Sequence, residues 1–145
     1  MKIYVTGLGV VSGIGIGVSE NIEALRQRKH GIGKITLFPT ALDVPVSEVK
    51  RSNEELKKLI SLPPQHTVSR TALLGMIAAE EAMKDAGLTP PLRIGFISST
   101  SVGGMDLSEH FYESFKKNPG QGRLREVISH DCGASTELIA SYLGI

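Results

Sequence analysis

The chain opens with an apolar run, Ile3–Val5, which leads into a glycine-rich stretch, Gly7–Gly17, and then into a helical pattern. A short apolar run followed by glycines and a helix is typical of a buried parallel β-strand that feeds a crossover connection. We therefore predict a strand over residues 2–11. A helix is predicted from the N-cap residue Ser19 to about Lys29, with acidic residues in its first turn and basic residues in its last.

The middle of the chain contains two further helical patterns. The sequence Ser-Asn-Glu-Glu at residues 52–55 is a capping box, which predicts the start of a short helix that ends before Pro63. The strongest pattern covers residues 67–86 and ends at Gly87. Its first half is apolar on nearly every face, which indicates a central helix buried in a larger structure. One face carries only small residues: Ala72, Gly75, Ala79, Ala82 and Ala86.

The last third of the chain begins with a second apolar run, Arg93–Ser99, which predicts a short buried strand. A loop of small residues follows, and Asp106 with Glu109 is expected to cap the next helix. A final helix is predicted to end at Gly144. This order of elements predicts an α/β fold with a mixed, mainly parallel sheet. Two strands are too few to cover the apolar helices, so we expect the chain to form only part of a larger fold.

Composition narrows the class of protein. The chain has 145 residues, of which 41% are apolar and 21% charged, as in an ordinary globular domain. Its net charge of +1 and its aromatic content of 5%, with no Trp, argue against nucleic-acid binding. The single cysteine, Cys132, fits a reducing compartment. Because no apolar stretch approaches the ~20 residues that span a bilayer, a cytoplasmic location is expected.

The glycine run also invites a nucleotide-binding interpretation. That interpretation needs Gly-x-Gly-x-x-Gly at the start of a helix and an acidic residue at the end of a second strand. Here the motif would begin at Gly7 and Gly9, but its sixth position is Ser12 instead of Gly. The helix is also predicted only from Ser19. A dinucleotide-binding domain therefore remains the weakest of three functional hypotheses, and close approach of the backbone explains the glycines better.

The sequence His130-Asp131-Cys132 resembles a nucleophile beside its base. Residues two apart point to opposite sides of a strand and about 200° apart on a helix, so these side chains are not expected to form a catalytic dyad. No spacing of His and Cys resembles a zinc site. We assign no catalytic residue and no metal ligand. Four basic residues flank a turn at residues 118–122, where they form either a solvated face or a docking patch for an acidic partner: Lys116, Lys117, Arg123 and Arg125.

Three segments in order resemble one family. TGLGVVSGIG at residues 6–15 resembles the N-terminal signature of β-ketoacyl-[acyl-carrier-protein] synthases, the elongating condensing enzymes of the thiolase superfamily. SRTALLGMIAAEEAMKDAGL at residues 69–88 is similar to their central helix. RIGFISSTSVGG at residues 93–104 is similar to the strand and glycine loop that follow. Each motif alone is weak, but their order and spacing are specific.

The resemblance implies most of the N-terminal half of a thiolase fold. It places the catalytic Cys shortly beyond Ile145 and the catalytic His and Lys residues in the second half, so residues 1–145 alone are expected to be inactive. Val102 matches the loop position that closes the acyl pocket, and Gly103 and Gly104 match its hinge glycines. The basic residues at 116–125 fall where the family meets acyl carrier protein.

The implied reaction is decarboxylative condensation of acyl and malonyl thioesters through an acyl-cysteine, by a dimer that needs no metal or organic cofactor. Phosphopantetheine of the carrier supplies the substrate arm. Residues 133–137 depart from the family's pattern, which leaves the acyl length open. The alternative is a non-catalytic partner subunit, like a chain-length factor, that keeps the fold and lacks the nucleophile.

Overall fold

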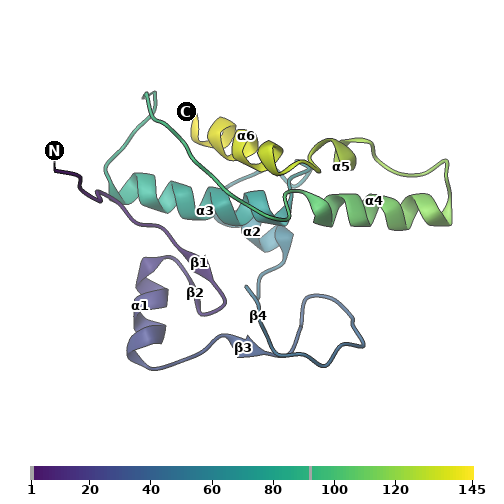
Figure 1. The fold of residues 1–145 in the computed structure, drawn as a ribbon, viewed down its shortest axis with the longest axis horizontal. Coiled ribbons are helices and arrows are strands. Elements are labelled where there is room, and N and C mark those ends of the chain that lie inside the picture. Colours follow the sequence, from purple (N-terminus) through teal and green to yellow (C-terminus); the bar gives the residue numbers. More distant parts are fainter. Residues whose placement is uncertain (1, 92) are drawn as a thin grey trace.

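The computed structural model describes residues 2–91 and 93–145, and helices dominate it (Figure 1). Two short antiparallel strand pairs join them: β1 with β2 and β3 with β4. The elements in chain order are β1 (Val11–Ser12), β2 (Gly15–Ile16), α1 (Val18–Arg26), β3 (Ile32–Gly33), β4 (Val46–Ser47), α2 (Asn53–Leu59), α3 (Arg70–Asp85), α4 (Met105–Lys117), α5 (Arg125–Ile128) and α6 (Cys132–Leu143).

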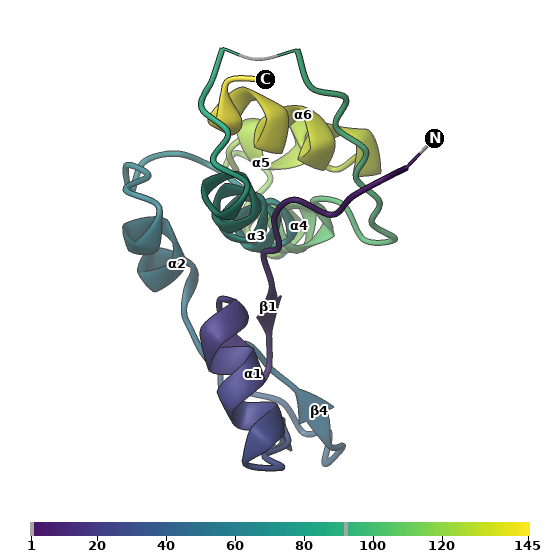
Figure 2. The same cartoon turned by 90° about the vertical axis from the view of Figure 1, so that its left-hand side faces the viewer.

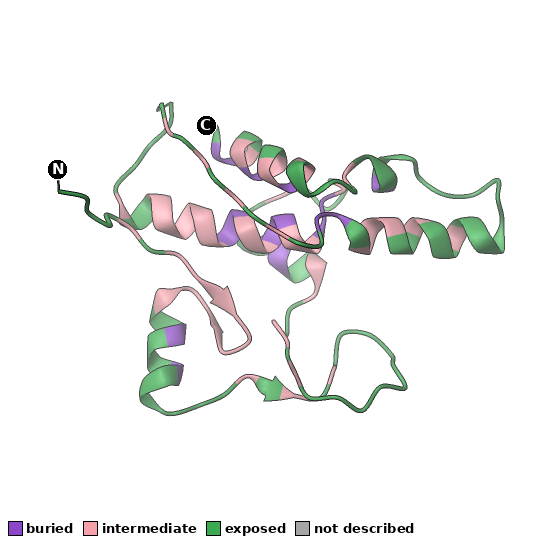
Figure 3. Cartoon of the chain, in the orientation of Figure 1, coloured by how far each residue is buried: buried purple, intermediate pink, exposed green. Residues whose placement is uncertain are grey.

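The core lies where α3 packs against α6 and α2 (Figures 1 and 3). On α3, the buried residues all lie in the first half: Ala72, Leu73, Met76 and Ile77. Leu56 of α2 is also fully buried, and α6 contributes Ile139 and Leu143. A Cβ at Gly75 would stand 2.5 Å from the Cδ1 atom of Ile139, so the glycine lets the two helices approach closely.

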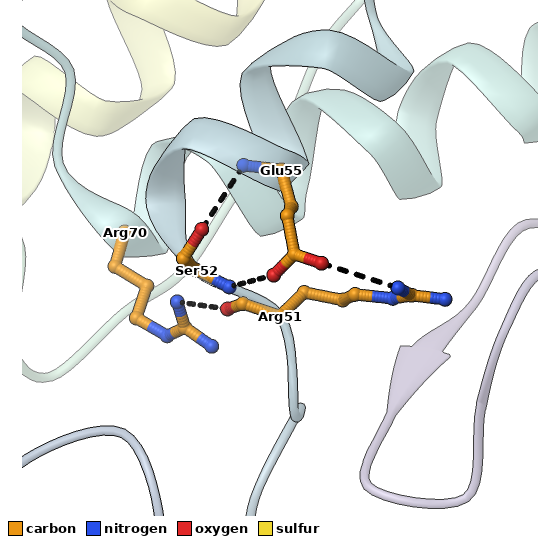
Figure 4. A network of polar contacts seen from close by, with 4 residues as sticks. All are labelled: Arg51, Ser52, Glu55 and Arg70. Carbon is orange, nitrogen blue, oxygen red and sulfur yellow. Dashed lines mark hydrogen bonds and ion pairs between the residues drawn. The ribbon is translucent and has the colours of Figure 1, made fainter.

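Helix ends follow the sequence signals closely. The predicted capping box is confirmed: the Ser52 hydroxyl accepts from the Glu55 amide at 3.2 Å, and Glu55 accepts from the Ser52 amide at 2.7 Å (Figure 4). The predicted helix ends at Gly87 and Gly144 are confirmed too. Both glycines have left-handed φ angles, 65° and 71°. These signals act over a few residues, which is why they can be read from local sequence.

The predicted parallel sheet is not found among the described residues. Residues 2–10 and 93–100 run without strand pairing, and the sheets that form are two-residue antiparallel pairs. Burial alternates strictly along residues 93–100, with even positions half-buried and odd positions exposed. This is the period of a β-strand. The segment therefore has a strand pattern, but a strand also needs neighbours that bond to its backbone.

Two predicted helix starts were also wrong. The first helix begins at Val18 rather than Ser19, with Gly17 as its N-cap, and it ends at Arg26. Helix α4 begins at Met105 with Gly104 as its N-cap. The side chain of Asp106 therefore does not cap its own helix, and its partner lies on α3. Among the described helices, none is both long and apolar enough to cross a membrane.

Candidate functional site

The glycine run lies against the small-residue face of α3 (Figure 2). A Cβ at Gly9 would stand 1.8 Å from the Ala78 carbonyl oxygen, and one at Gly7 would stand 2.2 Å from that of Ala82. Both contacts are to backbone, which cannot rotate away. The glycines are therefore needed for close approach, as the sequence indicated, and the stripe of alanines on α3 is the surface they approach.

Carboxylates of α3 accept the backbone hydrogen bonds of this run. Asp85 accepts from the Leu8 amide at 2.9 Å, and Glu81 accepts from the amides of Val10 at 3.0 Å and Val18 at 2.7 Å. A phosphate cradle needs free N–H groups at a helix N-terminus. Here the carboxylate of Glu81 already occupies the start of α1, and its negative charge would repel a phosphate. This contact argues against the nucleotide-binding hypothesis.

The loop that carries Val102, Gly103 and Gly104 leads directly into α4. The Thr100 hydroxyl accepts from the amides of Val102 and Gly103, each at 3.2 Å. Val102 is 49% exposed, whereas both glycines are buried. The three residues assigned to a substrate pocket thus share one loop, with Val102 at its exposed tip.

Gly103 and Gly104 pack against the segment that precedes α6. Gly103 has a φ of 51°, and its Cβ would stand 2.8 Å from the His130 carbonyl oxygen. A Cβ at Gly104 would stand 1.9 Å from the carbonyl oxygen of Ser129, and the Gly104 amide donates to His130 at 3.4 Å. Any side chain at either position would displace the loop from α6.

The side chains of His130, Asp131 and Cys132 have separate surroundings. Asp131 caps α6 and accepts from the Gly133 amide at 3.1 Å. The His130 ring lies 2.9 Å from the Ser108 hydroxyl, and Cys132 is exposed. The side-chain hydrogen bonds of His130 and Asp131 are therefore made with residues other than Cys132. Within the part of the chain that the structure describes, no group of three His, Cys, Asp or Glu residues is placed to hold a metal ion.

The four basic residues flank the turn of the α4–α5 hairpin, and all are exposed. Lys116 and Lys117 end α4, whereas Arg123 and Arg125 follow the turn. Lys117 is paired with Glu113 at 2.6 Å, and its hydrogen bond lowers the pKa of that carboxyl. Gly122, with a φ of 127°, lies over the ring of Phe111, which folds the turn back onto α4. Leu124 and Ile128 nearby are also exposed, at 75% and 78%. The hairpin end is therefore cationic with an apolar margin.

Three residues organise these regions: Arg70 and Glu81, which sequence reasoning missed, and Asp106, to which it gave the wrong partner. Each makes its hydrogen bonds to residues far away in the sequence, at separations from 17 to 71 residues. The signal for Glu81 was present in part, because it precedes Asp85 by four residues on one helix face. Nothing local in the sequence identifies the partner of Asp106.

Comparison with known proteins identifies the family. Residues 1–144 match the family described as the N-terminal domain of β-ketoacyl synthase, and the chain belongs to this family. It is 28% identical over 128 residues to nodulation protein E of Rhizobium meliloti strain 1021, covering 82% of this chain and 30% of that protein. It is 30% identical over 122 residues to 3-oxoacyl-[acyl-carrier-protein] synthase 2 of Coxiella burnetii, covering 78% and 28%.

A solved structure supports the fold as well. The ishigamide ketosynthase/chain length factor matches with a TM-score of 0.79 at 27% identity, covering 97% of this chain and 36% of that one. The family predicted from three sequence motifs is thus confirmed, and the fold is the thiolase-like ketosynthase fold. The chain spans about a third of the length of the relatives it matches.

Proposed function

We propose that the chain forms the N-terminal part of a 3-oxoacyl-[acyl-carrier-protein] synthase, which condenses acyl and malonyl thioesters in fatty acid or polyketide-type biosynthesis. The observation that carries the proposal is the family match over residues 1–144. The reaction is two-step acyl transfer. A Cys thiolate accepts the acyl group, and decarboxylation of the malonyl thioester then gives the carbanion that attacks it. In this proposal the thiolate belongs to a Cys other than Cys132, whose sequence neighbour His130 has its ring 2.9 Å from the Ser108 hydroxyl.

In this proposal the loop tip at Val102 borders the acyl chain. The buried glycines, Gly103 and Gly104, hold the tip in place through their contacts with residues 129–132. An apolar tip on a firmly seated loop suits a specificity element, because its position limits how long an acyl chain fits beside it. The reaction as proposed uses no metal or organic cofactor beyond the phosphopantetheine of the carrier.

The cationic end of the α4–α5 hairpin is proposed to meet acyl carrier protein, an acidic partner. Support comes from the exposure of Lys116, Arg123 and Arg125 and from the apolar side chains of Leu124 and Ile128 beside them. A charged rim steers association, and apolar contacts add affinity at short range. The active protein is proposed to be a homodimer or heterodimer.

A second candidate is a non-catalytic subunit of the chain-length-factor type. The observation that favours it is the similarity to a structure titled as a ketosynthase/chain length factor. The two candidates differ in one chemical property: a condensing enzyme carries a nucleophilic Cys that a non-catalytic subunit lacks.

One experiment separates the two candidates. The gene is sequenced on both sides of the coding region for these residues, and its complete product is incubated with acyl-carrier thioester. Intact mass spectrometry then detects an acyl-enzyme, and malonyl-dependent release of CO₂ detects condensation. An acyl adduct on a Cys other than Cys132 supports the enzyme. A product with neither adduct nor CO₂ release, and no Cys downstream, supports the non-catalytic subunit.

A further inference from the structure

Asp106 links the start of α4 to the start of α3. Its Oδ2 atom accepts from the Arg70 amide at 2.8 Å, across 36 residues of sequence. Arg70 is the first residue of α3, whose N-cap hydroxyl, Ser69, is fully buried and accepts from the Ala72 amide at 3.2 Å. Asp106 therefore satisfies a helix-terminal N–H group that the helix's own N-cap does not reach.

The side chain of Arg70 is held by three hydrogen bonds of its own. Its guanidinium donates to the carbonyl oxygen of Arg51 at 2.9 Å (Figure 4). It also donates to the carbonyl oxygen of Val49 at 2.6 Å and to the side chain of Asn53 at 2.9 Å. These bonds join the start of α3 to the segment that enters α2. Because α2 and α3 share the core, the amide that Asp106 contacts belongs to the most firmly held part of the fold.

Asp106 also lies only two residues beyond the glycine pair of the Val102 loop. On its other side, this loop is held by Gly103 and Gly104 against the backbone of residues 129–132. Figure 1 shows α4 beginning beside the N-terminal end of α3, so the loop enters α4 at the point where Asp106 makes its contact. The exposed tip at Val102 thus stands on a loop with two anchors.

We propose that Asp106 is a positioning residue for this loop: by accepting from the Arg70 amide it fixes where the Val102 tip stands, and thereby contributes to acyl-chain selectivity. The first part, that Asp106 fixes the position of the loop, rests on the contacts alone. The selectivity part rests on the proposed function. Asp106 touches no substrate in this proposal and acts only through the loop.

The first test measures amide hydrogen exchange by NMR in the protein and in two graded variants. Asp106→Asn keeps an acceptor oxygen but loses the charge, so the amides of Arg70, Val102 and Gly103 should exchange about threefold faster. Asp106→Ala removes the acceptor, and the same three amides should exchange about tenfold faster. Glu109→Ala, which removes an exposed carboxylate from the same helix, is the matched control and should leave all three unchanged.

Whether exchange at Arg70 and exchange in the Val102 loop change together decides if Asp106 positions the loop. If Asp106→Asn speeds exchange at Arg70 but leaves Val102 and Gly103 at the original rate, the loop is not positioned by Asp106 and the proposal is wrong. Should Asp106→Ala unfold the protein, as far-UV circular dichroism would show, Asp106→Asn still supplies this comparison. A general rise in exchange that includes the Leu56 amide of α2 in Asp106→Asn would indicate a merely structural role and overturn the proposal.

The second test uses the active enzyme with a series of acyl-carrier donors of different length. Asp106→Asn should change the ratio of kcat/KM between long and short donors by about threefold, as small shifts in an apolar pocket do. Lower stability alone would reduce all donors equally. An unchanged ratio overturns the selectivity role. If the unmodified protein turns over no donor while the exchange coupling is present, the proposed function fails and the positioning role stands.

Discussion

Replacement of Gly9 by Ala tests whether the N-terminal run is held by its close approach to α3. In the native arrangement the new Cβ would lie 1.8 Å from the Ala78 carbonyl oxygen and 2.8 Å from the Ala82 amide nitrogen. Because both contacts are to helix backbone, the N-terminal segment itself must move away, by more than about 1 Å. The hydrogen bonds from Leu8 to Asp85 and from Val10 to Glu81 would lengthen past their useful range.

The expected cost follows from these two effects. Overpacking of a close contact costs about 1–3 kcal/mol. Hydrogen bonds to charged acceptors are worth about 1.5–3 kcal/mol when buried, but these two are exposed or half-buried and water replaces them in part. We therefore expect the free energy of unfolding to fall by about 2–3 kcal/mol. For a chain of this size that lowers Tm by about 6–10 °C.

Urea denaturation followed by far-UV circular dichroism measures the change, since the chain has no Trp for fluorescence. The matched control is Gly95→Ala, because a Cβ at Gly95 would meet nothing within 4 Å. Both variants lose the same backbone freedom in the unfolded chain, so the difference between them isolates the steric effect. If Gly9→Ala and Gly95→Ala unfold within about 0.5 kcal/mol of each other, the close-approach explanation of the glycine run is refuted.

Three further predictions concern the cap, the buried phenol and the cationic surface. Ser52→Ala removes the capping box of α2 and should lower the free energy of unfolding by about 1 kcal/mol in the same urea assay; no change would mean that water replaces the cap. Partial burial, together with the hydrogen bond to Glu80, raises the pKa of Tyr142 to about 12, so absorbance at 295 nm should show a phenol that ionises only near pH 12. Because the folded state holds this proton more tightly than the unfolded state, the resulting stability is full below about pH 10 and is lost as pH rises toward 12; a titration in which no phenol ionises near pH 12 would contradict it. Arg123→Glu combined with Arg125→Glu should raise KM for carrier-bound donors several-fold at low salt with little change in kcat, and an unchanged KM would count against carrier docking at this surface.

The accuracy of the sequence predictions depends on how far apart the interacting residues are. The capping box at residues 52–55 and the glycine ends at 87 and 144 involve neighbours within one or two helical turns, and the structure confirms them. The predicted strands at residues 2–11 and 93–99 depend on pairing with other segments. Their apolar runs are present, and one alternates in burial, but the predicted sheet is not among the described residues.

Asp106 shows why a correct residue type can receive the wrong role. An acidic residue near a helix start, followed three residues later by Glu, is a sound capping signal. The prediction that Asp106 caps its own helix is wrong, because its carboxylate accepts at the start of α3 instead. Local sequence indicates that Asp106 suits an N-terminal N–H group, and only the position of the start of α3 beside the start of α4 decides which one.

The same reasoning separates the two interpretations of the glycine run. A phosphate loop and a segment packed on a helix both require glycines, since both bring backbone N–H groups close to an acceptor. They differ in what the acceptor is. Here Glu81 accepts from Val10 within the run and from Val18 directly after it, so one carboxylate of α3 does what a phosphate would do in a nucleotide-binding loop. Glu81→Gln would therefore not create a phosphate site, because the amide would still fill the start of α1, and titration with NAD(H) should show no saturable binding to either form.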